Sequence, residues 1–255
     1  MTILKINIVY CGDCLQVMKV IPNETIDMVL CDLPYGKTRC EWDKEIDLNI
    51  LWGEYERIIK SNGVIVLTAA QPFASKLVMS NLKLFRYEWI WEKSKATGYL
   101  NSKRMPLMAS ENILIFYKHL PIYNPQKTYR NPYNKGKAYR PTEVYGRQIS
   151  VEVKSDGERL PRNVIYFRTA ESEGKLHPTQ KPIALFEYLV KTYTNEGDLV
   201  LDNCIGSGTT GIACINTKRN FIGIELNNEY AKIAANRCKV ELIDWKSIQV
   251  VKGAL

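Results

Sequence analysis

Short, almost wholly apolar runs constrain the fold of this chain more than any other feature of its sequence. The run VIVLTA, residues 64–69, contains no charged residue, and the run at 26–31 is nearly as apolar. Runs of this kind are typical of strands that are buried on both faces of a parallel sheet. Segments with helical spacing alternate with them over most of the length. The sequence therefore predicts an α/β fold with a doubly wound, mostly parallel sheet.

The strands and the clearest helix can be placed along the chain from this pattern. Strands are expected at 6–10, 26–31, 64–69, 85–93, 111–118, 198–204 and 220–226. One helix is expected at 47–61, with a stop at Asn62-Gly63. The N-terminus does not resemble a signal peptide, and no apolar run approaches membrane-spanning length. We therefore expect a cytoplasmic protein without a membrane partner.

Residues 119–175 break the alternation and are interpreted as an insertion within a single domain that spans 1–255. The insertion is polar and turn-rich, and its basic residues outnumber its acidic ones by roughly two to one. The chain has a net charge of +8, which favours a polyanionic partner. Basic residues interleaved with tyrosines fit a surface that holds phosphates and stacks on bases, and a solvated loop fits the segment equally well. Candidate nucleic-acid contacts are Arg130, Lys135, Lys137 and Arg140.

The cysteines and histidines do not indicate a metal site. Seven cysteines, an odd number, are scattered through apolar segments, as expected of reduced thiols. The sequence Cys11-Gly12-Asp13-Cys14 is a CxxC, but no second pair stands at zinc spacing. The only two histidines, His119 and His177, lie far apart. We therefore predict no metal.

A glycine-rich loop follows the strand expected at 198–204. Gly206, Gly208 and Gly211 have the spacing G-x-G-x-x-G, and Glu225 ends the next strand, nineteen residues after Gly206. A strand, a glycine loop and a helix, followed by a downstream acid, are typical of a unit that binds a ribose. The acid is expected to accept hydrogen bonds from both ribose hydroxyls.

The charge beside this loop separates two classes of cofactor. Asp202 stands at the strand end just before the loop, where it would repel the pyrophosphate of a dinucleotide. The same carboxylate would attract the ammonium and sulfonium groups of S-adenosylmethionine. Backbone amides of the loop, together with Ser207 and Thr209, can receive the carboxylate of its methionine end. We therefore expect S-adenosyl-L-methionine rather than a nicotinamide cofactor.

The strand at 26–31 ends in Asp32-Leu33-Pro34-Tyr35-Gly36, which presents an acid, a rigid turn and an aromatic ring together. Taken alone, these residues could simply form a turn. The sequence DLPYG, however, resembles the D-P-P-Y motif of DNA amino-methyltransferases, which methylate adenine N6 or cytosine N4. HPTQKP at 177–182, VLDNCIGSGTT at 200–210 and FIGIEL at 221–226 are similar to the cofactor half of the same family. The catalytic motif precedes the cofactor motifs, which is the β-class order.

The resemblance implies a mechanism and a set of functional residues. Asp32 and the carbonyl of Leu33 would accept hydrogen bonds from the exocyclic amino group of the target base, beside Pro34, so that the nitrogen lone pair faces the cofactor. Tyr35 would stack on a base that has left the duplex, and no cysteine nucleophile is needed. The cofactor contacts that the family implies include Asp13 at the adenine end and Thr179 and Lys181 near the methionine end.

The sequence departs from the family pattern at two places, and several interpretations remain. Leu33 replaces the usual proline, and Asn203-Cys204-Ile205 replaces the commoner Pro-Phe-Ala. The Asp-initial motif favours adenine N6 over cytosine N4. The alternatives are cytosine N4, the same chemistry on RNA or single-stranded DNA, a catalytically silent DNA-binding relative, and a nicotinamide oxidoreductase. The resemblance also implies a role in DNA methylation of the restriction–modification kind, on duplex DNA with a flipped base, and is compatible with a homodimer.

Overall fold

The computed structural model describes residues 5–36, 45–137, 152–174 and 180–245. The chain divides into two compact units, one formed by Met1–Asn124 with Asn163–Leu255 and the other by Pro125–Arg162. The smaller unit lies within the insertion expected at 119–175. Residues 119–124 and 163–174, which the sequence pattern assigned to that insertion, belong to the larger unit.

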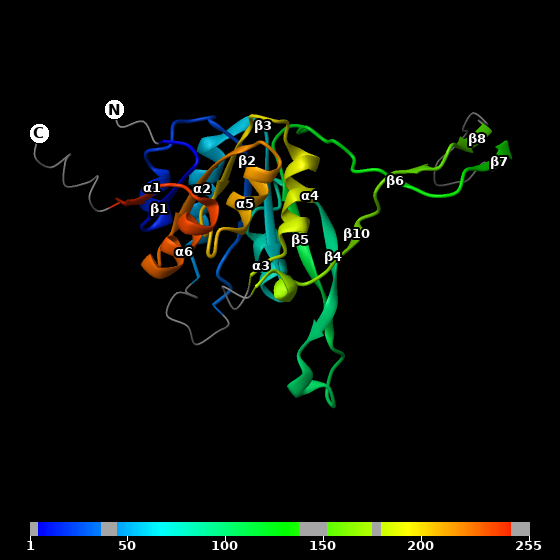
Figure 1. Cartoon of the computed structure of the whole chain (residues 1–255), viewed down its shortest axis with the longest axis horizontal. Helices are drawn as coiled ribbons and strands as arrows, with labels where there is room; N and C mark the ends of the chain where they lie inside the picture. The colour runs from blue at the N-terminus through cyan, green and yellow to red at the C-terminus, as the bar shows by residue number, and fades with distance from the viewer. Residues whose placement is uncertain (1–4, 37–44, 138–151, 175–179, 246–255) are drawn as a thin grey trace, which may run out of the picture. The chain divides into compact units, whose positions relative to one another are not determined.

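The larger unit is built on one nine-stranded sheet with the order β10-β4-β5-β3-β2-β11-β12-β1-β13 (Figure 1). The strands are β1 (Ile8–Cys11), β2 (Ile26–Asp32), β3 (Ile59–Ala69), β4 (Phe85–Thr97), β5 (Met108–Phe116), β10 (Val164–Phe167), β11 (Leu199–Asp202), β12 (Asn220–Glu225) and β13 (Leu242–Asp244). Within this sheet, only β5 runs antiparallel to its neighbours, β3 and β4. The prediction of a mostly parallel α/β sheet is confirmed.

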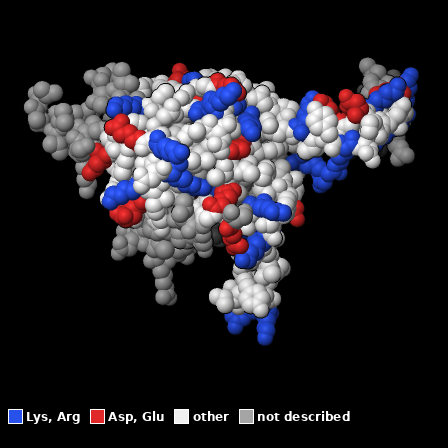
Figure 2. Space-filling model, in the orientation of Figure 1, with Lys and Arg blue, Asp and Glu red and all other residues white. Residues whose placement is uncertain are grey.

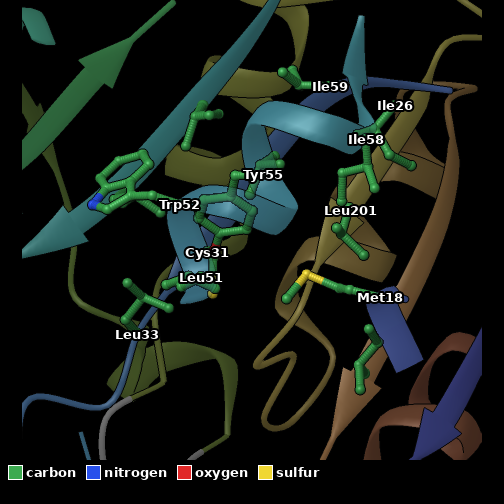
Figure 3. Close-up of a cluster of buried hydrophobic side chains, with 14 of the residues drawn as sticks. Met18, Ile26, Cys31, Leu33, Leu51, Trp52, Tyr55, Ile58, Ile59 and Leu201 are labelled. Atoms are coloured by element: carbon green, nitrogen blue, oxygen red, sulfur yellow. The ribbon is translucent and has the colours of Figure 1, made fainter. Parts of the chain in front are cut away.

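Helices cover both faces of this sheet. They are α1 (Cys14–Met18), α2 (Leu48–Ile58), α3 (Phe73–Ser80), α4 (Ile183–Tyr193), α5 (Thr209–Asn216) and α6 (Asn228–Cys238), with short 3-10 helices η1 (Tyr99–Asn101) and η2 (Ala170–Glu173). Buried side chains of α1, α2 and α3 form one core cluster, part of which is shown in Figure 3. Those of α4, α5 and α6 form a second cluster.

Strand β2 shows why the apolar runs are continuous rather than alternating. Val29 and Cys31 are buried in the first cluster, whereas Met28 and Leu30 are buried in the second. Successive side chains of a strand point to opposite faces, so a strand between two helical layers must be apolar at every position. The central strands therefore hold the two layers together and fix the position of the residues at their ends.

The helix expected at 47–61 is shorter than its sequence pattern suggested, since α2 ends at Ile58 and β3 begins at Ile59. Ile59 pairs with Ile26 of β2, and the register then shifts before Met28 pairs with Val64. A Cβ on Gly63 would lie 2.9 Å from the carbonyl oxygen of Asp27. Strand pairing thus overrides the helical spacing of the last apolar residues, and the glycine permits the close approach.

The smaller unit contains two short antiparallel pairs of strands. These pairs are β6 (Thr128–Tyr129) with β9 (Glu158–Arg159), and β7 (Tyr133–Lys137) with β8 (Glu152–Ser155). The guanidinium of Arg159 lies over the ring of Tyr133, 4.4 Å from its centroid. This tyrosine therefore packs within the unit, whereas Tyr129 is 75% exposed.

The described part of the chain lacks two features of other protein classes. None of its helices is both long and apolar enough to cross a membrane. No group of three or more His, Cys, Asp or Glu side chains there is arranged to hold a metal ion.

Candidate active site

A cavity of about 640 Å³ opens at the carboxyl ends of the central strands. Asp32 ends β2, Asp202 ends β11 and Glu225 ends β12, and these three strands are neighbours in the sheet. All three carboxylates line the cavity. Ligands of doubly wound sheets bind at this edge, and small-molecule sites have volumes of about 300–1,000 Å³. The fold thus brings the DLPY motif and the glycine loop, which are far apart in sequence, into one site.

The carboxylate of Asp32 accepts hydrogen bonds from three side chains. Its Oδ1 accepts from the hydroxyl of Tyr35 at 2.7 Å and from that of Thr68 at 2.5 Å. Its Oδ2 accepts from the ammonium of Lys181 at 2.7 Å. Hydrogen bonds that involve an ionised group are the strong ones, so this acid is held in one orientation at the strand tip.

The other residues of the DLPY motif also have defined positions. Leu33 is 3% exposed, and its side chain belongs to the core cluster shown in Figure 3. Leucine at the usual proline position therefore anchors the motif in the core. The ring of Tyr35 is tilted against that of Phe73, with centroids 5.1 Å apart. Burial raises the pKa of Tyr35 well above its usual value, which keeps its hydroxyl protonated and able to donate.

Behind Asp32 lies a buried chain of alternating charges that the sequence patterns did not reveal. The ammonium of Lys181 lies 3.3 Å from Oε2 of Glu111, and Oε1 of Glu111 accepts a hydrogen bond from Lys93 at 3.2 Å. The side chain of Lys93 is 5% exposed and that of Lys181 is 8% exposed. Starting from Asp32, the four charges alternate in sign and sum to zero.

The charge state of Lys181 follows from this arrangement. Burial lowers the pKa of its ammonium, but the negative charges of Asp32 and Glu111 outweigh the burial and hold the pKa well above its usual value. Lys181 therefore remains charged at neutral pH. The sequence contained one signal for the partners of Lys181, because Lys93 and Glu111 are charged residues at the ends of the strands expected at 85–93 and 111–118.

The glycine loop is shaped by contacts that need glycine and by the two acids. Gly208 has a φ of +91°, and a Cβ there would lie 3.0 Å from the Cα of Ala234 in α6. The backbone N–H of Gly206 donates to Oε2 of Glu225 at 2.9 Å, and that of Asn227 donates to Oε1 at 2.8 Å. Glu225 thus connects the first glycine of the loop to the end of β12.

Asp202 is buried directly beneath the same loop. It is 4% exposed, and it accepts hydrogen bonds from the backbone N–H of Cys204 and from the hydroxyl of Thr210. Burial raises the pKa of Asp202 to about 7, although these hydrogen bonds lower it. The carboxyl group can therefore change its charge near neutral pH. Burial likewise raises the pKa of Glu225 above its usual value.

The remaining residues of the predicted site are distributed as follows. Asp13 caps α1, accepting from the backbone N–H of Gln16, and lines the cavity. Ser207 and Thr209 also line it. Thr179 and Arg140 lie outside the described residues. The candidate nucleic-acid contacts that the structure describes, Arg130, Lys135 and Lys137, belong to the smaller unit.

The walls of the cavity are suited to a ligand that carries positive charge. Among the described residues that line it, eight are acidic and two are basic. Both basic residues, Lys93 and Lys181, are engaged by acids of the buried chain of charges. The excess of carboxylates fits the ammonium and sulfonium of S-adenosylmethionine and opposes a dinucleotide pyrophosphate.

Comparisons with known proteins agree with this site. The model of the N6/N4 family, described as a DNA methylase, matches residues 26–236. The match covers most of the chain, and the protein belongs to the N6/N4 DNA methylase family. It is accordingly a DNA amino-methyltransferase, acting on adenine N6 or cytosine N4.

Two curated relatives and one solved structure illustrate the likeness. Type II methyltransferase M.HpaI of Haemophilus parainfluenzae is 27% identical and covers 93% of this chain and 76% of its own length. DNA adenine methyltransferase YhdJ of Escherichia coli (strain K12) is 29% identical, covering 90% of this chain and 81% of its own length. The crystal structure of M1.HpyAVI in complex with SAM has a TM-score of 0.64 at 26% identity, covering 91% of this chain and all of that one. The predictions of the family and of its cofactor, S-adenosylmethionine, are confirmed.

The buried chain of charges gives a prediction for stability. Lys93→Met leaves one uncompensated negative charge among Asp32, Lys181 and Glu111, and should lower the free energy of unfolding by about 3 kcal/mol. Lys93→Met/Glu111→Leu removes a neutral pair and should restore most of that loss. Urea unfolding at neutral pH measures both variants.

A matched control for this comparison is Lys95→Met, on the same strand. Lys95 forms an exposed ion pair with Glu171, and its loss should cost less than about 0.5 kcal/mol. The proposed balance of charges would be contradicted if Lys93→Met/Glu111→Leu were as unstable as Lys93→Met. It would also be contradicted if Lys93→Met were as stable as Lys95→Met.

Proposed function

We propose that this chain is an adenine-specific DNA methyltransferase, which transfers the methyl group of S-adenosylmethionine to N6 of an adenine that has left the duplex. The observation that carries the proposal is that the strand tip with Asp32 and Tyr35 shares one cavity with the glycine loop and Glu225. Adenine is favoured because the catalytic motif begins with Asp. A relative named as a DNA adenine methyltransferase, 29% identical over most of the chain, supports the same choice.

The proposed catalytic role belongs to Asp32, Leu33, Pro34 and Tyr35. The exocyclic nitrogen of adenine is a poor nucleophile because its lone pair is delocalised into the ring. Asp32 accepts a hydrogen bond from one amino hydrogen and the carbonyl of Leu33 accepts from the other, which directs the lone pair toward the cofactor. The cofactor supplies an electrophilic methyl group. When the amino nitrogen takes the methyl group, positive charge would develop on that nitrogen, the Asp32 carboxylate would stabilise the charge, and one amino proton would then leave to solvent.

Tyr35 and Lys181 would take different roles when a base enters. The Tyr35 hydroxyl donates to Oδ1 of Asp32, the side that the amino group would use. If Tyr35 swings out to stack on the base, its hydroxyl leaves Oδ1 and frees one acceptor position on that oxygen, while the hydroxyl of Thr68 keeps the other. Lys181 remains on Oδ2 and keeps the acid oriented. The entry of a base is thus an exchange of one hydrogen-bond donor for another.

The proposed cofactor contacts follow the cavity wall. Each carboxylate oxygen of Glu225 accepts one backbone N–H and keeps further acceptor capacity, enough for two ribose hydroxyls. Asp202 attracts the positive charges of the methionine end through the loop. The proposed set is Asp13, Thr179, Lys181, Asp202, Gly206, Ser207, Gly208, Thr209 and Glu225.

The first test concerns the catalytic acid. Asp32→Ala should lower methyl transfer to DNA by at least about 100-fold, as expected for the loss of a group that acts on the transition state, while binding of S-adenosylmethionine is largely retained. Methyl transfer is measured with labelled cofactor, cofactor binding by calorimetry, and the product base by mass spectrometry of digested DNA.

The control for this variant is Asp27→Ala, in the same strand. Asp27 forms an ion pair with Lys60 away from the cavity, so its loss should affect stability and leave turnover of the folded protein unchanged. Substantial turnover by Asp32→Ala would refute the proposed role of Asp32 in methyl transfer. N4-methylcytosine as the product would replace adenine by the cytosine alternative, and binding of DNA without any transfer would favour the silent relative.

The second test uses the titration of Asp202. Because its pKa in the folded protein, about 7, lies above the usual value of 3.8, the cofactor-free protein should lose stability as pH rises from about 4 to about 7. In that interval the unfolded chain has released the proton and the folded chain retains it. Cofactor affinity should change in the opposite sense and weaken as pH falls below about 7, because a neutral carboxyl no longer attracts the cation.

Asp202→Asn should bind the cofactor more weakly at pH 8 and should lose both pH dependences. Urea unfolding and calorimetric titration at about pH 5, 6, 7 and 8 measure the two effects. Identical pH profiles of cofactor affinity for Asp202→Asn and the unchanged protein would refute the role of Asp202 in cofactor binding.

The third test concerns the basic residues Arg130, Lys135 and Lys137 of the smaller unit, together with Arg140. Arg130, Lys135, Lys137 and Arg140 are proposed to bind DNA phosphates, so replacing all four by Ser should weaken binding to every DNA sequence. Each phosphate that is no longer bound should reduce the slope of log affinity against log salt by about 0.9.

Two lysines of the same unit provide the control. Lys127 and Lys154 are each paired with a glutamate, so their charge is already balanced within the unit, and their replacement should change the slope little. An equal slope for the quadruple variant and the unchanged protein would support the solvated-loop interpretation.

A further inference from the structure

Strands β4 and β5 continue past the sheet as an arm, which we define as residues 97–110 (Figure 1). Thr97 pairs with Met108, and beyond this pair the chain forms the turn of helix η1. Gly98 enters the turn with a φ of +90°, and Arg104 and Met105 both donate backbone N–H groups to the carbonyl of Asn101. The tip of the arm is therefore an ordered turn.

The arm exposes large apolar side chains that no part of the described structure covers. Every residue of the arm is exposed, with Leu100 98% exposed, Tyr99 80% and Met105 51%. These residues contribute nothing to the core, and a cluster of exposed apolar side chains commonly marks an interaction surface. Their partner must offer an apolar contact.

The same arm is basic. Lys103 and Arg104 lie next to the apolar tip, and the arm contains no acidic residue. Neither of these two side chains forms an ion pair with an acid of the described residues. Figure 2 shows this end of the hairpin as a white tip with blue basic residues beyond it. The charge fits a polyanion, and it opposes a second copy of the same arm, which would bring like charges together.

The strand segments from which the arm extends form part of the wall of the cavity. Trp91, Lys93, Thr97 and Glu111 all line the cavity, and all belong to β4 or β5. Lys93 donates to Thr97 at 3.4 Å and to Glu111 at 3.2 Å, which fixes the base of the arm to the buried chain of charges beside Asp32. The arm therefore extends from a wall of the same cavity that Asp32 lines.

We infer that the arm enters duplex DNA beside the target base, with Leu100 as an apolar wedge in the base stack and Lys103 and Arg104 on the flanking phosphates. The inference rests on the proposed function, since a base that enters the cavity must first leave the duplex. Apolar side chains inserted at a base step unstack it, and basic neighbours hold the backbone while this occurs. The arm thus supplies the separation of the base that the cavity requires.

The wedge is tested with two duplexes that contain the sequence methylated by the unchanged protein, as mapped by base-resolved sequencing. In one duplex the target base is paired, and in the other it is mismatched. Leu100→Ser should lower kcat/KM on the paired duplex at least tenfold, and the mismatch should restore most of the loss, because the base is already unpaired. The matched control is Leu82→Ser, which changes an exposed leucine elsewhere and should behave as the unchanged protein on both duplexes.

The charges are tested by DNA affinity at several salt concentrations. Lys103→Ser/Arg104→Ser should bind both duplexes more weakly, with a salt slope smaller by about 0.9 for each phosphate that the variant no longer binds. Lys218→Ser/Lys232→Ser, which removes two exposed lysines elsewhere, is the control and should keep the slope.

Several outcomes would overturn the inference. Unchanged kinetics of Leu100→Ser on the paired duplex, or the same loss of kcat/KM on both duplexes, would refute the insertion of Leu100 into the base stack. A change in the sedimentation of DNA-free Leu100→Ser would assign the arm to contacts between copies of the chain. If the unchanged protein transferred no methyl group to DNA, the proposed function would fail. An unchanged salt slope for Lys103→Ser/Arg104→Ser would separately refute the binding of DNA phosphates by the arm.

Discussion

The ion pair between Asp32 and Lys181 is the interaction on which the organisation of the site depends. The two residues are 149 positions apart, and their side-chain atoms lie 2.7 Å from one another. Asp32 stands at the end of a central strand. Lys181 just precedes α4, which belongs to the layer of helices formed by α4, α5 and α6. The pair therefore fixes the tip of β2 relative to the segment that leads into α4, and the carbonyl of Lys181 accepts a hydrogen bond from Thr209 of the glycine loop. It also explains why a lysine is buried there, since both ions would be costly to bury alone.

Burying this pair has consequences further into the molecule. Lys181 faces two carboxylates, Asp32 and Glu111, so the site would carry a net negative charge if the chain ended there. Lys93 restores neutrality, and its own burial is acceptable because Glu111 accepts its hydrogen bond. Through these contacts, Lys93 of β4 and Glu111 of β5 are connected to Asp32 at the end of β2. The same strands extend as the arm, so the orientation of the arm and that of Asp32 share one set of contacts.

The sequence was sufficient for seven of the nine strands of the sheet and for the placement of the acids at their ends, but not for β10, which lies in the expected insertion, or for β13. Apolar runs such as 64–69 have one stable environment, between two layers, and the carboxyl ends of parallel strands must meet at one edge. The end of α2 could not be predicted, because Ile59 fits a helix locally and a strand only once β2 is beside it. Glu111 and Lys93 were missed for a similar reason. Each is an ordinary charged residue in its own strand, and its meaning depends on a pairing between strands and on Lys181. Likewise, the DLPY motif predicted that Asp32 would accept hydrogen bonds, but not that Tyr35 and Thr68 already donate to it.

The distribution of charge over the molecule separates the two ligands of the proposed reaction. The chain as a whole has a net charge of +8, whereas the described lining of its cavity has eight acidic residues against two basic ones. A polyanion is attracted to the outside and repelled from the cavity, so the phosphates of DNA would remain at the surface. A cationic cofactor is attracted inward. The part of DNA that can cross this boundary at low electrostatic cost is a neutral base, and a base can cross it only after leaving the stack. The charge pattern thus favours base flipping independently of the catalytic motif, because it admits the nucleobase and excludes the backbone to which it is attached.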